Sequence, residues 1–180
     1  MPLSTQRARL ATRDLTIFAA LSTIMFLSRI LMQGIPSVHL LGLFIASITL
    51  TYRVRALIPL YGYIMLDGVF AGFSTWWMPY LYMWLPLWLT FMVAGKINLP
   101  RRVQLPLYMV LCGLHGLSFG LLYAPAQALM FGLSFQAMIA WIIAGLPFDI
   151  IHALGNFAAG SLIIPLSSLM KNLDSGQYRA

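Results

Sequence analysis

The chain has 180 residues, of which 61% are hydrophobic, 13% aromatic and only 8% charged, and its formal net charge is +7. A soluble globular domain has about 45–50% apolar and about 25% charged residues, so this composition excludes that class, and the aromatic content excludes intrinsic disorder. The single cysteine excludes a disulfide framework and a cysteine-based metal centre. We therefore expect one all-α transmembrane domain over residues 1–180.

Apolar runs along the chain predict six membrane-spanning helices, each needing about 20 residues. In chain order the predicted spans are residues 15–33, 38–52, 54–73, 78–95, 103–123 and 147–170. The first run is long and has no small-residue cleavage site behind it, so it indicates a retained helix rather than a signal peptide. Pro147 should break or kink the long apolar stretch 135–170. Residues 124–146 are therefore predicted to be a loop with a short helical or re-entrant piece.

The positions of the cations predict the orientation of these spans. Ten of the eleven lie between the apolar runs, at the first turn of one (Arg55) or at the chain ends: in the N-terminal segment 1–14, the second-to-third and fourth-to-fifth loops and the tail 171–180. They are Arg7, Arg9, Arg13, Arg53, Arg55, Lys96, Arg101, Arg102, Lys171 and Arg179. Six spans place all four segments on one side, and the positive-inside rule makes that side cytoplasmic for both termini. The basic charge thus needs no nucleic-acid partner.

Besides Arg55 at the start of its span, three charged residues lie within the predicted spans, namely Arg29, Asp67 and Asp149. Ionised groups in a bilayer are usually paired or functional, and the chain direction brings all three toward the outer side. Asp149, His152 and Asn156 have the spacing i, i+3 and i+7, which puts them on one helical face. Three alternatives stay open: an N-terminal helix cap by Asp149, interhelical hydrogen bonds by His152 and Asn156, and a structural ion pair of Arg29 with either aspartate.

Aromatic residues cluster at the predicted outer side, where residues 74–84 hold five of them. An interfacial aromatic belt would explain such residues, but aromatic walls with a few polar groups are also typical of small-molecule pockets. We therefore predict an outward-facing pocket for an uncharged or zwitterionic solute. Its candidate residues are Arg29, His39, Asp67, Trp76, Trp77, Tyr80, Tyr82, Tyr123, Asp149, His152 and Asn156.

Ala19, Ala20 and Thr23 form a patch of small residues on the first predicted helix. Small residues let helices approach closely, so this patch either packs within the chain or docks a partner subunit.

Residues 116–120 match the pattern G-x-S-x-G, but the hydrolase motif needs a strained strand-to-helix turn, whereas this segment lies within an apolar run. Gly116 and Gly120 are better explained as a helix-packing face. An intramembrane hydrolase using Ser118 or His152 is the alternative. No nucleotide motif, metal-ligand set or cofactor motif is present, so we expect neither an enzyme nor a bound cofactor.

The segment Gly145-Leu-Pro-Phe-Asp-Ile-Ile-His-Ala-Leu-Gly-Asn156 resembles the signature that opens the last helix in S-components, the substrate-binding subunits of energy-coupling factor (ECF) vitamin transporters. The patch at residues 19–23 is similar to their A-x-x-x-A docking motif, with Thr23 in place of the second alanine. Similarity around residues 35–36, 76–80 and 111–116 is greatest to the cobalamin-type members.

This resemblance implies a multi-pass protein of the bacterial cell membrane that captures a vitamin from outside. It also implies a transmembrane T-component and two cytosolic ATPase subunits as partners, with release of the vitamin inward after the subunit topples in the bilayer. Cobalamin is the implied ligand, and a queuosine precursor or another small vitamin is the alternative. An assembly subunit without any ligand is a further possibility.

Overall fold

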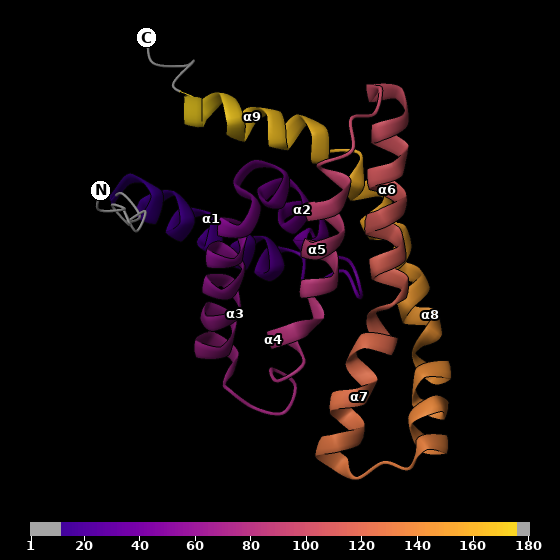
Figure 1. Ribbon diagram of the computed structural model, residues 1–180. Helices are drawn as coiled ribbons and strands as arrows, with labels where there is room; N and C mark the ends of the chain where they lie inside the picture. Colours follow the sequence, from indigo (N-terminus) through magenta and orange to yellow (C-terminus); the bar gives the residue numbers. More distant parts are fainter. Residues whose placement is uncertain (1–11, 176–180) are drawn as a thin grey trace, which may run out of the picture.

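The computed structural model describes residues 12–175, which form helices joined by turns and contain no strand within that range (Figure 1). The helices in chain order are α1 (Thr12–Leu31), α2 (Leu41–Tyr52), the 3-10 helix η1 (Arg53–Ala56), α3 (Leu57–Ala71), α4 (Tyr80–Met83), α5 (Leu85–Ala94), α6 (Arg101–Leu117), α7 (Phe119–Phe131), α8 (Phe135–Gly160) and α9 (Ile163–Ser175). The predicted all-α class is confirmed.

Four helical segments are long and apolar enough, by length and composition, to cross a membrane. They are Thr12–Leu31, Leu41–Ala71, Arg101–Phe131 and Phe135–Gly160, and Tyr80–Ala94 is a shorter apolar helix. These segments suit a membrane-embedded protein. Six separate spans stay a prediction, because α2 has only 12 residues, about 18 Å of helix against a hydrocarbon core of about 30 Å.

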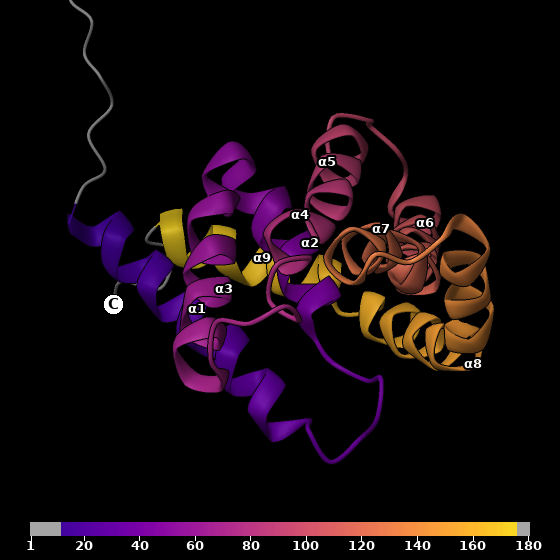
Figure 2. The same cartoon turned by 90° about the horizontal axis from the view of Figure 1, so that it is seen from below.

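The helices fall into two groups with a central layer between them. Viewed from below, α6, α7 and α8 gather on one side, α1 and α3 on the other, and α2, α4 and α5 lie between (Figure 2). In the other view α3, α5, α6 and α8 run roughly up and down, while α9 lies crosswise above α2 and α3 (Figure 1).

Helix α2 is the core of the molecule. Its residues 41–43 and 45–49 are all buried, so it has no face exposed to solvent or lipid. A helix that is hydrophobic all round is stable only when other helices cover it on every side. Here α5, α8 and α9 pack against it, which makes α2 the element around which the two groups assemble.

Helix α8 has the opposite construction. Its buried residues are Asp149, His152, Asn156 and Gly160, whereas large apolar residues along its length, such as Ile143 and Leu154, are exposed. Polar side chains point inward and apolar ones outward, as expected for a helix surrounded by lipid. The predicted common face of Asp149, His152 and Asn156 is confirmed.

Glycines allow α8 to lie close to α6. A Cβ atom added at Gly116 would lie 2.8 Å from the backbone oxygen of His152, and one at Gly160 would lie 2.8 Å from Cα of Met109. A Cβ at Gly113 would already contact Ala153 O at 3.4 Å. The interpretation of Gly116 as part of a helix-packing face is therefore confirmed, and it extends over both helices.

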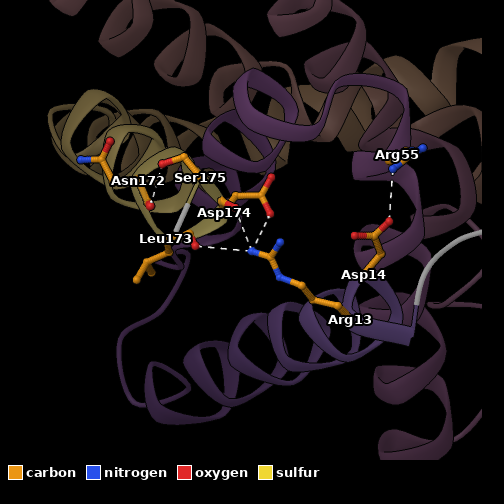
Figure 3. A network of polar contacts seen from close by, with 7 residues as sticks. All are labelled: Arg13, Asp14, Arg55, Asn172, Leu173, Asp174 and Ser175. Atoms are coloured by element: carbon orange, nitrogen blue, oxygen red, sulfur yellow. Dashed lines mark hydrogen bonds and ion pairs between the residues drawn. The ribbon is translucent and has the colours of Figure 1, made fainter. Parts of the chain in front are cut away.

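The chain ends that the structure describes are joined by ion pairs at the N-terminus of α1 (Figure 3). Arg13 Nη2 lies 3.1 Å from Asp174 Oδ1 and donates to the backbone oxygen of Asp174 at 2.9 Å. Arg55 Nη1 lies 3.2 Å from Asp14 Oδ2. These contacts attach α1 to both α9 and η1. The segments 1–11 and 176–180, which include Arg7, Arg9 and Arg179, lie outside the described residues.

Of the predicted break or kink at Pro147, the break is wrong, because α8 continues through this residue from Phe135 to Gly160. Nor is there a long loop or re-entrant piece at residues 124–146, since α7 runs to Phe131 and only a short turn separates it from α8. Gly132 has φ 64°, the left-handed conformation that ends helices, and Ser134 Oγ caps α8 by accepting from Ala137 N at 3.2 Å. The last predicted span is likewise divided into α8 and α9.

The close α6–α8 contact predicts opposite effects for two glycines. Gly116→Ala should lower the free energy of unfolding by about 1–3 kcal/mol, because its Cβ meets backbone that cannot move aside. Gly145→Ala, on the same helix pair, meets nothing within 4 Å and should stabilise by up to about 1 kcal/mol through helix propensity. Thermal unfolding in detergent measures both, and equal effects would contradict the proposed contact.

Candidate functional site

A cavity of about 300 Å³ lies between α8, the start of α7, α4 and the segment before α2. It is lined by Ser37, His39, Tyr80, Phe119, Gly120, Trp141, Gly145, Phe148, Asp149 and His152. Four of the predicted site residues, His39, Tyr80, Asp149 and His152, thus meet at one place although they come from three separate parts of the chain. Aromatic rings form most of the wall.

Asp149 does not cap its own helix, because it lies in the middle of α8 and not at the start of a helix as predicted. Its carboxylate instead accepts from the backbone N–H of Gly120, at 3.2 Å for Oδ1 and 3.1 Å for Oδ2. Gly120 belongs to the first turn of α7, whose N–H groups have no partner within the helix. A carboxylate at a helix N-terminus is favourable, so Asp149 caps α7 across the helix interface.

That cap exists because the predicted fifth span is interrupted. Helix α6 ends at Leu117 and α7 begins at Phe119, with Ser118 between them. The Ser118 hydroxyl donates to the backbone oxygen of His115 at 2.8 Å, so its hydrogen goes to its own helix and not to an imidazole.

Two histidines in the lining of the cavity contact each other. Nε2 of His39 and Nε2 of His152 lie 2.5 Å apart, so one ring nitrogen donates and the other accepts. Nδ1 of His39 is buried without a hydrogen-bond partner. Because His39 belongs to the segment that joins α1 to α2, this contact fixes that segment against α8.

Further aromatic rings pack against the residues that line the cavity. Trp84 is only 1% exposed, stacks parallel to Tyr80 at 5.9 Å and packs at 5.6 Å against the ring of His115. Phe119 stacks on Tyr123 at 5.9 Å, and Tyr123 stacks on Trp141 at the same distance. These rings hold the cavity-lining residues Tyr80, Phe119 and Trp141 in place.

The aromatic segment 74–84 thus divides between the cavity and other contacts. Trp76 packs on Tyr80, and its backbone oxygen accepts from Tyr123 Oη at 3.1 Å, so both support the cavity without lining it. Trp77 lies against α3, where Nε1 donates to Ile64 O at 2.8 Å. Tyr82 Oη donates to Leu122 O at 2.7 Å, away from the cavity. Trp77 and Tyr82 therefore do not belong to this site.

Arg29 and Asp67 form a pair of their own between α1 and α3. Arg29 Nη1 lies 3.0 Å from Asp67 Oδ1, and the aspartate side chain is only 1% exposed. Neither residue lines the cavity. Of the alternatives left open by the sequence, the arrangement matches the structural pair of Arg29 with Asp67, and Asp149 takes no part in it.

Asn156 lies one helical turn beyond His152 but outside the cavity, in the space that two glycines leave between α2, α6 and α8. A Cβ atom at Gly42 would meet its Oδ1, and one at Gly116 would lie 2.8 Å from its Nδ2. The side-chain oxygen is buried without a hydrogen-bond partner. Asn156 therefore underlies the site and does not face it.

Several residues of the cavity are absent from the set that the sequence predicts. Phe119, Gly120, Trp141, Gly145 and Phe148 were missed because the segments 118–120 and 135–148 were not expected to lie beside His39. Phe148 lies about one turn and Trp141 about three turns before His152 on α8, so a helix continued through Pro147 would have placed both on the same face as His152.

The small-residue patch on α1 lies on the surface of the molecule. Ala19, Ala20 and Thr23 are all exposed, so the alternative that they pack within the chain is wrong for the described residues. The Thr23 hydroxyl donates to Ala19 O at 2.9 Å, which satisfies its polar group without a partner. The patch is therefore smooth, uncharged and available for contact.

The site offers stacking surfaces, two imidazoles, a carboxylate and a phenol to a small molecule. Among residues 12–175, no three His, Cys, Asp or Glu side chains are arranged to hold a metal ion. Comparisons with protein-family models, curated proteins and solved structures find no match to this chain.

The buried ion pair of Arg29 and Asp67 should contribute more to stability than the exposed pair of Arg13 and Asp174. Arg29→Met leaves Asp67 buried without its counter-charge and should lower the unfolding free energy by about 3 kcal/mol. Arg13→Ala removes a pair whose side chains are 48% and 42% exposed and should cost less than about 1 kcal/mol. Thermal unfolding in detergent distinguishes the two, and Asp67→Leu in the Arg29→Met background should recover most of the loss.

Proposed function

We propose that this chain is the membrane-embedded, solute-binding subunit of an ECF-type vitamin uptake transporter, with six spans and both termini in the cytoplasm of a bacterial cell. The observation that carries the proposal is the cavity, in which aromatic rings surround His39, His152 and Asp149 within a chain of apolar helices. Pockets that bind small molecules have this composition, mostly apolar with a few convergent polar groups.

The cavity volume bears on the choice of ligand. About 300 Å³ lies at the lower limit of the range for small-molecule sites, which supports a flat heterocycle of the size of a queuosine precursor. The cobalamin implied by the sequence resemblance is much larger. It would require the segment that carries His39 to move away from α8, separating His39 from His152.

The transport role assigns the energy source to other subunits, because the sequence has no nucleotide-binding motif. The exposed patch at Ala19, Ala20 and Thr23 is the surface proposed for the T-component, and two cytosolic ATPase subunits complete the assembly. Small residues at this surface would let a partner helix approach closely.

A calorimetric panel of vitamins and flat heterocycles, with cobalamin included, tests the binding role. The ligand that binds should lose at least about tenfold in affinity with His152→Ala, because a hydrogen-bonding group of the cavity is removed. Tyr82→Phe should leave the affinity unchanged, since the Tyr82 hydroxyl donates outside the cavity. Absence of binding to every panel member would contradict the proposal.

Co-purification tests the docking role. Ala19→Trp places a large ring on the exposed patch and should abolish recovery of the T-component with this chain. Leu154→Trp is the matched control, because Leu154 is 65% exposed on α8, far along the chain from the patch. Equal recovery with both variants would exclude the patch as the docking surface and leave the ligand site unaffected.

A further inference from the structure

Four cations gather where α5 ends and α6 begins, and three of them have no counter-charge among residues 12–175. Lys96, Arg101 and Arg102 are all exposed. Arg53, the fourth, is occupied with the end of α5, because its Nη2 donates to the backbone oxygen of Met92 at 2.5 Å.

The four acidic residues of the protein are all engaged elsewhere. Asp14, Asp67 and Asp174 pair with Arg55, Arg29 and Arg13, and Asp149 caps α7. Within residues 12–175, no carboxylate lies within ion-pair distance of Lys96, Arg101 or Arg102. These three exposed charges are therefore available to an anionic group of another molecule.

An apolar groove of about 450 Å³ starts beside this basic cluster and runs along the α5–α6 interface. Its lining consists of Leu89, Thr90, Val93, Ala94, Ile97, Leu107 and Leu111. Ile97 directly follows Lys96, and Leu89 lies eight residues earlier, so the groove extends about 12 Å away from the charges. Charges at one end and an apolar channel behind them match the two parts of a phospholipid.

The charges favour a lipid over an apolar helix of another protein, because the groove ends beside three exposed cations that an anionic headgroup would neutralise. We propose that the α5–α6 groove binds an anionic phospholipid, with one acyl chain along Val93 and Leu111 and the phosphate at Lys96, Arg101 and Arg102. Basic pockets between helices at the cytoplasmic leaflet bind lipid headgroups in this way.

The charge part of the site is tested on the full chain in an uncharged detergent by native mass spectrometry. The probes are phosphatidylglycerol and phosphatidylcholine with identical acyl chains, and the wild type should retain phosphatidylglycerol preferentially. Lys96→Ala should weaken retention about fivefold, and further replacement of Arg101 and Arg102 should abolish the preference. Lys171→Ala removes an exposed cation on α9 and should leave it unchanged.

The groove is tested separately with the charges intact. Val93→Trp fills the groove and should reduce phosphatidylglycerol retention, whereas Val69→Trp places the same ring on the exposed outer surface of α3 and should not. Glycerol phosphate, which has the headgroup charge without acyl chains, should not compete. Melting temperatures without added lipid verify that each variant is folded.

Three results would overturn the lipid site. Equal losses with Lys96→Ala and Lys171→Ala would reduce the effect to general surface charge, and an unchanged preference with Val93→Trp would remove the groove from it. Unaltered lipid binding in the triple variant, together with loss of co-purifying subunits, would assign the basic cluster to an acidic protein partner. None of these outcomes depends on the vitamin ligand proposed above.

Discussion

The close packing of α8 on α6 and α7 is the interaction on which the rest of the molecule depends. Gly116 and Gly160 remove the Cβ atoms that would hold the helices apart, and the polar stripe of α8 then faces protein instead of lipid. Without this contact, Asp149, His152 and Asn156 would face hydrocarbon instead of protein, which is costly for each of them. The same contact creates the cavity, because its floor and most of its wall belong to α7 and α8.

Polar groups in this protein serve helix ends and helix interfaces as much as they serve the cavity. Asp149 caps α7 from α8, and Arg53 occupies the carbonyl end of α5 from the turn after α2. Arg53 itself has φ 56°, an unfavourable conformation for a residue with a side chain, and the bond from Trp88 Nε1 to its backbone oxygen, at 3.3 Å, helps to hold it there. The chain has few charged residues, and two of them, Arg53 and Asp149, hydrogen-bond to helix ends whose backbone groups lack partners within the helix.

Much of the architecture follows from the sequence because it depends on composition and period alone. The apolar runs predict an all-α membrane protein, and the i, i+3, i+7 spacing predicts the inward face of α8. Helix ends were harder to predict. Local chemistry at Pro147 predicts a break or a kink, whereas packing against α6 and α7 supports both halves of α8, so the helix continues through this residue. The boundary between α7 and α8 lies at Gly132, which ends α7, and at Ser134, which caps α8. These two roles can be recognised in the sequence only when the helix that follows has been predicted correctly.

The site was predictable to the extent that its residues share one helix. His39 and Tyr80 were identified from their polar or aromatic character at the expected level, but their contact with α8 depends on tertiary packing. Trp77 and Tyr82 look the same in sequence as Tyr80, yet their polar atoms bond to backbone oxygens outside the cavity. Trp77 lies in the turn before α4, and Tyr82 lies on α4 two residues after Tyr80, so neither points where Tyr80 does.

The turn of three residues between α7 and α8 has a consequence for biogenesis. The polar stripe of α8 is tolerated in the bilayer only when α8 packs against the glycine-containing helix α6. An isolated α8 would therefore be unstable in lipid. The short turn keeps α8 next to α7, which directly follows α6, as soon as these helices leave the ribosome. The α6–α7 segment and α8 are therefore best inserted together as one helical hairpin.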